Sequence, residues 1–283
     1  MTDTQQHIHA YYSPEDLFEK IKSALVESGR GLENLTLDDL QPVDEFHIRG
    51  QTATMELIKL SGFTANMHIL DIGCGIGGSA RRLADVVGCH VTGVDLSEHY
   101  ITTADALSGL VGMQEKVSFQ ASNALNLPFY DENFDGIWSI QMNMNIHDKP
   151  AWLKEMRRVL KPGGRLVLYE VCGNVNTPPY FPVPWAQDAT MSNLITPGQF
   201  RETIIEADFA IDAWHDKTDL AYNAFAQVPE PTNDSILPEL GVHLLVGQDI
   251  LTKAYNLRRN LEEERVSLIE AVAVKSEMER DRV

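Results

Sequence analysis

Residues 68–79, HILDIGCGIGGS, place four glycines directly after a short apolar run. The apolar residues at 69, 70 and 72 predict a buried strand, and the apolar residues of segment 80–87 have helical spacing. Glycine suits such a turn because a Cβ would block positive φ values and would hold a ligand away from the main chain. The stretch therefore predicts a strand, a turn and a helix that bring the backbone close to a ligand.

The same alternation of short strands and helices continues along the chain. Further strands are expected over residues 90–94, 117–121, 134–140, 165–171, 209–214 and 266–274, and helices over 97–110, 150–160 and 196–207. This alternation predicts an α/β fold with a doubly wound, mostly parallel sheet. In such a sheet, ligands bind at the carboxyl ends of the strands.

Two regions lie outside this alternation. Helix starts at Ser13 and Thr36 and a helical pattern over 51–60 predict an N-terminal helical cap, residues 1–66, on a core of residues 67–283. Within the core, the proline and aromatic residues of about 173–195 predict an ordered loop. Residues 219–260 are expected to form a late helical insertion.

The charge balance restricts the partners of the chain. Asp and Glu total 41 against 23 Lys and Arg, which argues against nucleic acid or an anionic membrane as the main partner. No secretory signal is evident, and no apolar run reaches the ~20 residues of a membrane helix, so we expect a cytoplasmic protein. The cysteines, Cys74, Cys89 and Cys172, have neither disulfide nor metal spacing, and no metal site is expected. Whether the chain forms a homo-oligomer stays open.

The glycine turn has two readings from its residues alone. It could hold the pyrophosphate of a dinucleotide, or the amino-acid and ribose parts of S-adenosylmethionine. Asp71, two residues before Gly73, suits a cationic α-amino group better than a pyrophosphate. Asp95 ends the second strand, where a carboxylate accepts hydrogen bonds from the ribose of either ligand.

Four segments in order resemble the motifs of class I S-adenosylmethionine-dependent methyltransferases: LDIGCGIGG at 70–78, VDL at 94–96, FDGIW at 134–138 and RVLKPGG at 158–164. The resemblance implies a seven-stranded Rossmann-like sheet, S-adenosyl-L-methionine as cofactor and S-adenosyl-L-homocysteine as product. It implies cofactor binding by Asp71, Gly73, Gly75, Asp95, Leu96, Asn123, Ala124 and Gln141.

Flanking segments are similar to the sarcosine/dimethylglycine N-methyltransferase branch of that class: VDEFHIRG at 43–50, MNI at 144–146 and VPWA at 183–186. The sequence departs from the usual pattern at 122–124, where SNA replaces GDA, and at Gln141. By resemblance, Asn123 would pair with the adenine amino group beside the backbone amide of Ala124. Gln141 would face the methionine end of the cofactor.

The candidates for orienting a substrate are Arg49, Asn145, His147 and Trp185. Arg49 could pair with a carboxylate of cofactor or substrate, or lie on the surface. His147 could orient the substrate, whereas Asp148 beside it also fits a helix cap. An aromatic pocket could be formed by Tyr11, Tyr12, Tyr180, Phe181 and Trp185, which could equally be simple packing. No general base is identified.

The resemblance implies methyl transfer to a small molecule, first the amine of a glycine-type substrate such as sarcosine or dimethylglycine. One alternative is a C- or O-methyltransferase of a quinone-like ring, a keto acid or an isoprenoid. A second is a catalytically inactive S-adenosylmethionine-binding sensor or partner, because binding and turnover are separable.

Overall fold

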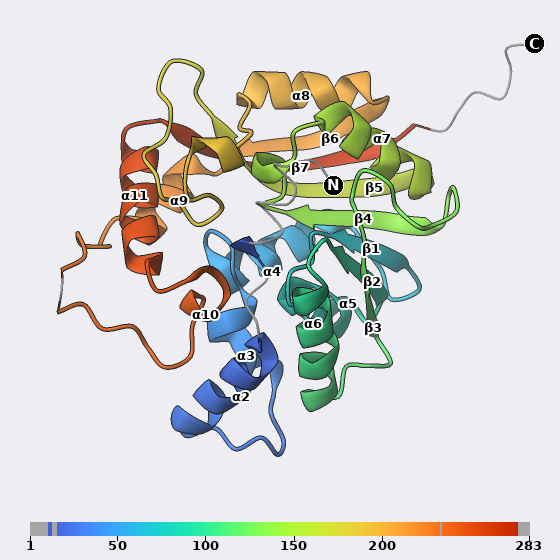
Figure 1. Cartoon of the computed structure of the whole chain (residues 1–283). Coiled ribbons are helices and arrows are strands. Elements are labelled where there is room, and N and C mark those ends of the chain that lie inside the picture. The colour runs from blue at the N-terminus through green and yellow to red at the C-terminus, as the bar shows by residue number, and fades with distance from the viewer. Residues whose placement is uncertain (1–10, 13–15, 233, 277–283) are drawn as a thin grey trace, which may run out of the picture.

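The computed structural model describes residues 11–12, 16–232 and 234–276. Within them, seven strands form one sheet in the order β3-β2-β1-β4-β5-β7-β6 (Figure 1). Neighbours from β3 to β5 run parallel, whereas β7 is antiparallel to both β5 and β6. The doubly wound, mostly parallel α/β sheet predicted from the sequence is therefore confirmed. The strands are β1 (His68–Ile72), β2 (His90–Asp95), β3 (Val117–Ala121), β4 (Phe134–Ile140), β5 (Leu160–Gly173), β6 (Phe209–Asp216) and β7 (Val266–Lys275).

Helices cover both faces of this sheet (Figure 1). The helices are α2 (Leu17–Glu27), α3 (Leu37–Asp44), α4 (Gly50–Ser61), α5 (Gly78–Val87), α6 (Glu98–Leu110), α7 (Lys149–Val159), α8 (Pro197–Glu206), α9 (Thr218–Phe225), α10 (His243–Val246) and α11 (Ile250–Glu262). One core cluster joins α4, α5, α9 and α11 to the sheet, and a second joins α7 and α8 to it. Successive strand residues alternate between the clusters, as Val167 and Leu168 do, because side chains of a strand point to opposite faces.

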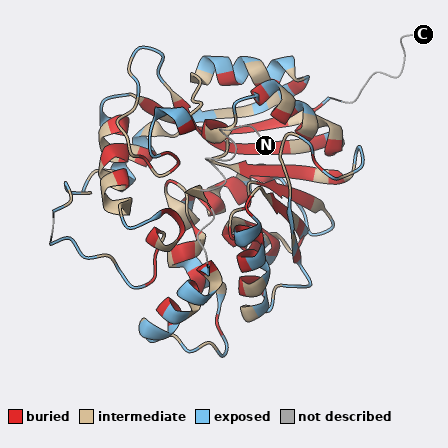
Figure 2. Cartoon of the chain, in the orientation of Figure 1, coloured by how far each residue is buried: buried red, intermediate tan, exposed pale blue. Residues whose placement is uncertain are grey.

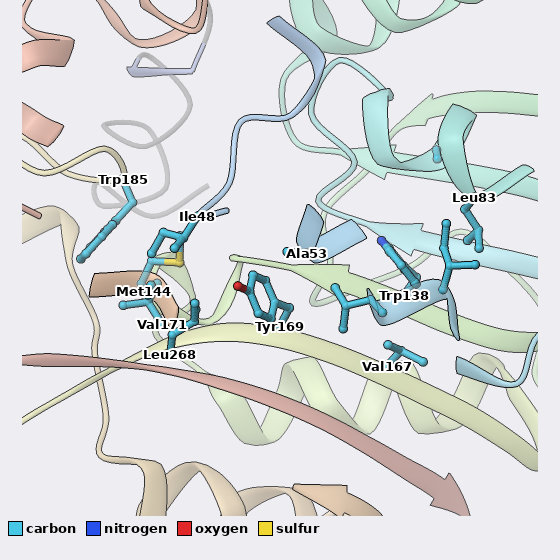
Figure 3. Packing of buried hydrophobic residues seen from close by; sticks show 14 of the residues in the cluster. Ile48, Ala53, Leu83, Trp138, Met144, Val167, Tyr169, Val171, Trp185 and Leu268 are labelled. Carbon is cyan, nitrogen blue, oxygen red and sulfur yellow. The ribbon is translucent and has the colours of Figure 1, made fainter. Parts of the chain in front are cut away.

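Burial follows this layering, since Figure 2 shows the strands buried and the helices buried only along one side. Figure 3 shows Trp138 and Tyr169 from β4 and β5 in the first cluster, with Ile48, Met144 and Trp185 toward one end of it. Trp138 and Tyr169 are fully buried. The rigid centre of the sheet thus supports segments that lie beyond its strand ends.

Local hydrogen bonds explain where several helices begin. The Ser97 hydroxyl accepts the Tyr100 N–H at the start of α6, and Asp148 accepts the Ala151 N–H at the start of α7. These two helices therefore begin where the sequence indicates. Ser13, with the expected first helix start, lies outside the described residues, and α2 follows from Leu17.

The N-terminal helices pack on different parts of the core. Helix α2 contacts α6, and both α3 and α4 contact α5. The Arg81 guanidinium of α5 forms a buried ion pair of 2.7 Å with Asp44 at the end of α3. The division of the chain at residue 67 stays a prediction.

Two expectations differ from the structure in extent. β5 starts at Leu160 instead of 165, because the turn residues 161–164 continue into the strand. The insertion at 219–260 is only partly helical: an irregular segment separates α9 from α10, where Pro229, Pro231 and Pro238 remove backbone donors that a helix needs. Among the described residues, no helix is long and apolar enough to span a membrane.

Candidate active site

A cavity of about 440 Å³ lies at the carboxyl ends of β1, β2 and β4. This is where the strand order reverses direction along the sheet, between β1 and β4. Its lining includes seven of the eight residues predicted to bind the cofactor: Gly73, Gly75, Asp95, Leu96, Asn123, Ala124 and Gln141. The lining also includes three of the four predicted substrate residues: Asn145, His147 and Trp185.

The glycine loop is held in place by its backbone. The Gly73 and Cys74 amides donate to the Val94 carbonyl oxygen at 2.8 and 3.1 Å, which ties the loop to β2. Gly73 has a φ of 79°, and a Cβ there would lie 1.9 Å from the Met142 sulfur. Only glycine fits this position.

Asp95 links the loop to the next helix. Its Oδ2 accepts the Gly75 N–H at 3.0 Å, and its Oδ1 accepts the Ser97 N–H at 2.9 Å. The carboxylate is therefore fixed at the cavity wall between the glycine loop and the start of α6. An acceptor group held in this way can bind ligand hydroxyls without losing side-chain freedom on binding.

Asp71 is the predicted cofactor residue that does not line the cavity. It is buried behind the loop, and the Ser79 hydroxyl, which does line the cavity, donates to it at 3.4 Å. Burial, with a smaller contribution from Asp95, raises the pKa of Asp71 to about 8. A direct contact with a cofactor amino group stays a prediction.

Buried carboxyl groups surround this end of the molecule. Burial raises the pKa of Glu45 to about 7 and that of Glu170 to about 8, and it raises the pKa of Asp44 despite the neighbouring Arg81. Among the described residues that line the cavity, there is no Lys or Arg. Because its lining contains aspartates and no described Lys or Arg, the cavity is better suited to a cation than to an anion.

The end of β4 offers an unpaired donor. The Glu170 carboxylate accepts the Met142 and Asn143 N–H groups, each at 2.8 Å, and so fixes the loop after the strand. Gln141, at a φ of 54°, has a buried side-chain nitrogen with no hydrogen-bond partner among the described residues. Because an unpaired buried donor is costly, this amide fits a ligand that accepts its hydrogen bond.

Asn123 has a role in its own loop. Its side-chain oxygen accepts the Leu125 N–H at 2.9 Å. An amide oxygen can accept a second hydrogen bond, so the arrangement is compatible with the implied adenine contact, which stays a prediction.

Asn145 joins three distant segments on the other side of the cavity. Its Nδ2 donates to the Trp185 and Met191 carbonyl oxygens at 3.0 and 3.2 Å. The Tyr12 hydroxyl donates to its Oδ1 at 3.4 Å. The indole N–H of Trp185 donates to the Ser192 hydroxyl at 3.1 Å, so the ring is fixed as well. The apolar lining here consists of Phe46, Met142, Met144, Ile146, Pro184 and Leu245.

Several aromatic and basic candidates lie elsewhere. Arg49 does not line the cavity, because its guanidinium pairs with both carboxylate oxygens of Glu56 at 2.9 and 2.6 Å. Tyr180 has the Arg259 and Arg265 guanidinium groups 3.9 Å from its ring centre, and neither it nor Phe181 lines the cavity. Tyr11 donates to the Pro184 carbonyl oxygen from outside the lining.

His147 was expected to orient a substrate, and Asp148 was expected to fit a helix cap as well. Both line the cavity and both are exposed, while Asp148 also caps α7.

Sequence reasoning missed Asp44, Tyr100 and Leu245, which also line the cavity. The Tyr100 hydroxyl donates to the Leu245 carbonyl oxygen at 3.2 Å. Tyr100 could have been found from its place one turn after Asp95, whereas no local pattern marks Leu245.

Comparisons with known proteins agree with the geometry. Residues 70–168 match the family model described as a methyltransferase domain. The chain is 34% identical over 141 residues to the O-methyltransferase resE of Aspergillus sclerotiorum, an alignment that covers 50% of this chain and 53% of the relative. The chain thus spans about half the length of the first curated relatives it matches.

Solved structures share the fold at low identity. The geranyl diphosphate C-methyltransferase of Streptomyces coelicolor A3(2) aligns over 97% of this chain and 98% of its own, with a TM-score of 0.70 and 17% identity. A putative sarcosine dimethylglycine methyltransferase of Galdieria sulphuraria aligns over 91% and 98%, with a TM-score of 0.63 and 15% identity. The comparisons thus support the methyltransferase class and do not single out the sarcosine/dimethylglycine branch. Residues 70–168 thus match a methyltransferase domain, and the chain has the fold of solved S-adenosylmethionine-dependent methyltransferases.

Proposed function

We propose that this protein transfers the methyl group of S-adenosylmethionine to a small, largely apolar acceptor that carries no strong negative charge. One observation supports this most: a single cavity has the glycine loop and Asp95 at one end and apolar residues around Trp185 at the other, with no Lys or Arg among its described lining residues. A donor and an acceptor could therefore lie in contact inside it.

The residues at the first end fit the cofactor. Asp95 would accept the ribose hydroxyls, and the unpaired amide nitrogen of Gln141 would donate to the methionine end. The buried carboxyl groups nearby favour the positive charge of a sulfonium and an α-ammonium group. The cofactor supplies an activated methyl group, so the protein's task is to orient the acceptor and exclude water, which can lower a barrier by ~7–11 kcal/mol.

The charge of the cavity lining restricts the acceptor. A carboxylate or a diphosphate held away from water needs a cation, and Arg49 is already paired with Glu56. We therefore infer an oxygen or carbon acceptor on a neutral molecule such as a phenol or a hydroquinone. The relative named as an O-methyltransferase is consistent with this choice.

A glycine-type amine, first expected from the sequence, is the second candidate. The carboxylate of Asp148 in the lining favours it, because it can attract a cationic amine before the amine loses its proton. The missing partner for its own carboxylate counts against it.

The test is to incubate the purified chain with labelled S-adenosylmethionine and separate panels of phenols, hydroquinones, isoprenoid alcohols, isoprenoid diphosphates, keto acids, sarcosine and dimethylglycine. We expect labelled product and S-adenosylhomocysteine with the neutral phenols or hydroquinones. Transfer only to sarcosine or dimethylglycine would replace the inferred acceptor by the second candidate. Cofactor binding without transfer to any panel would favour the non-catalytic sensor.

A further inference from the structure

A buried chain of three polar side chains lies beside the cavity, in the segment that leads into α4. His47 lines the cavity, and its side chain is only 6% exposed. The His47 Nε2 lies 3.1 Å from the Thr54 hydroxyl, which donates to the Glu45 carboxylate at 2.8 Å. The three side chains therefore connect the cavity wall to the Glu45 carboxyl group, whose side chain is 4% exposed.

The hydrogen bonds fix which ring nitrogen carries the proton. The His47 Nε2 lies 3.1 Å from the Gly50 carbonyl oxygen, which can only accept. Nε2 must therefore be protonated, and in a neutral imidazole Nδ1 then has a free lone pair. Nδ1 makes no hydrogen bond to any residue that the structure describes. The ring thus has one nitrogen bound within the protein and one available to a molecule in the cavity.

Burial shifts the pKa values of His47 and Glu45 in opposite directions. Burial lowers the pKa of His47 to about 4, so the ring is neutral at pH 7. Burial raises the pKa of Glu45 to about 7, against the hydrogen bond from Thr54. The ring of Tyr169 packs edge-on against His47, which adds to its desolvation.

Other charged groups also face Glu45. Asp44 beside it raises its pKa further, whereas Arg82 and Arg81 of α5 lower it. Because the arginines oppose the effect of burial, Glu45 can both hold and release a proton near neutral pH.

We propose that His47, Thr54 and Glu45 form a proton relay that accepts the proton of the acceptor's O–H or N–H group during methyl transfer. The proposal rests on the proposed function and assigns the general base that the sequence leaves unidentified. In this arrangement His47 is the catalytic residue, and Thr54 and Glu45 are positioning residues that act through it.

The step balances in atoms and charge. The S–CH₃ bond breaks with its electron pair left on sulfur, and an O–CH₃ or N–CH₃ bond forms. The acceptor's proton moves to Nδ1 of His47, and the Nε2 proton passes to the Thr54 oxygen while the Thr54 hydroxyl proton passes to the Glu45 carboxylate. The positive charge lost by the sulfonium thus neutralises Glu45, and the ring is neutral with its proton on Nδ1. After the product leaves, loss of the Glu45 proton to water and return of the ring proton to Nε2 restore the relay.

The relay also restricts the acceptor. A neutral Nδ1 accepts one hydrogen bond, so it orients a nucleophile that carries a proton and gives no help to an unactivated carbon. Ile48, the residue after His47, packs in the same cluster as Met144 and Trp185 and lies near Met144 (Figure 3). Together these features favour a phenol-like hydroxyl group or an amine.

The first test needs no acceptor. ¹⁵N NMR of the histidine-labelled full chain, with and without S-adenosylhomocysteine, would identify His47 by the loss of its signals in His47→Gln. We expect a neutral ring protonated at Nε2 from pH 6 to pH 8. A ring protonated at Nδ1, or an imidazolium in that range, would overturn the relay whether or not the protein methylates anything.

The second test uses the phenol and hydroquinone panel. Thr54→Val and Glu45→Gln should each lower kcat about tenfold or more, and His47→Gln about 100-fold, as expected for loss of general base catalysis. Thr54→Ser keeps the hydroxyl and should restore most of kcat, and Thr52→Val, the same change at an exposed site of α4, is the control. S-adenosylhomocysteine affinity should change less than twofold in all of them.

The pH profile separates the relay from a structural role. In the wild type, kcat should rise with pH to a plateau with a midpoint near 7, because only ionised Glu45 can take the proton. Glu45→Gln should lose this step. If Thr54→Val is as active as the wild type, the relay is wrong while the proposed function stands. If the wild type methylates nothing, the proposed function fails, and the NMR result still decides the state of His47.

Discussion

The two ends of the cavity are built in different ways. At the cofactor end, the hydrogen bond from Gly75 to Asp95 joins residues 20 positions apart, on neighbouring strand ends. At the acceptor end, the bond from Tyr12 to Asn145 spans 133 positions, and that from Asn145 to the Trp185 carbonyl oxygen spans 40. The first end is made largely of backbone amides and one carboxylate, and the second of side chains from four separate segments.

This difference has a consequence for function. The backbone of a tight glycine turn cannot be changed much without losing the turn, so the cofactor end allows few sequences. The acceptor end is assembled from loops that meet on a rigid sheet, where residues can change without disturbing the strands. Under the proposed function, the cofactor would be bound by the cofactor end, which allows few sequences, and the acceptor would be selected by the acceptor end.

The largest effect is expected from Gly73→Ala at the cofactor end. A Cβ at this position meets the Met142 sulfur at 1.9 Å, and the φ of 79° disfavours any side chain. The substitution should lower the free energy of unfolding by about 2–5 kcal/mol, as the sum of left-handed strain and overpacking, measured by urea denaturation.

Gly112→Ala is the matched control. Its φ is 69°, but a Cβ there has no atom within 4 Å. It should cost only about 1–2 kcal/mol for the backbone conformation. Equal losses in the two variants would show that the contact with Met142 does not constrain the loop.

Asp95→Ala tests the same end through binding. The carboxylate is held by the Gly75 and Ser97 amides and would accept hydrogen bonds from the cofactor. Loss of a charged hydrogen-bonding partner worth about 1.5–3 kcal/mol should weaken S-adenosylhomocysteine binding about 10- to 100-fold in calorimetry. Asp105→Ala, at an exposed site on α6, should leave the affinity unchanged. An unaltered affinity in Asp95→Ala would refute the ribose assignment.

The cofactor end was also the part of the cavity that the sequence could predict. A strand alternates with period 2 and a helix with period 3.6, and both signals are local, so the strands and the glycine turn could be placed to within a few residues. The prolines at 229, 231 and 238 show the limit of this reasoning, because residues 219–260 were expected to form one helical insertion and the structure has an irregular segment at these prolines.

The acceptor end could be predicted only in part. Trp185 and Asn145 were identified through resemblance and Tyr12 as an aromatic candidate, but no local pattern marks Leu245, which only tertiary packing brings to the cavity. Arg49 shows the opposite failure: its residue type suggested a ligand, whereas the fold places Glu56 within reach. A charged residue near a site is satisfied by whichever opposite charge lies closest.

Trp185→Phe tests whether acceptor binding is independent of cofactor binding. The change removes the indole N–H bond to Ser192 and part of the ring that lines the cavity. Aromatic contacts worth about 0.5–1.5 kcal/mol predict a rise of about 3- to 10-fold in the acceptor KM. The dissociation constant of S-adenosylhomocysteine should not change. Tyr180→Phe, in the same loop but outside the cavity lining, is the control, and a matching loss of cofactor affinity in Trp185→Phe would show that the two ends are coupled.

The smallest effect is expected at Arg49. A double-mutant cycle with Arg49→Ala and Glu56→Ala should give a coupling of about 0.2–1 kcal/mol in the free energy of unfolding, because Glu56 is partly exposed and water screens the pair. Neither variant should alter cofactor affinity or the acceptor KM. If Arg49→Ala raises the acceptor KM while Glu56→Ala does not, the guanidinium must leave Glu56 to bind an anionic acceptor. The acceptor end would then bind a carboxylate after all, and the charge argument for a neutral acceptor would fail.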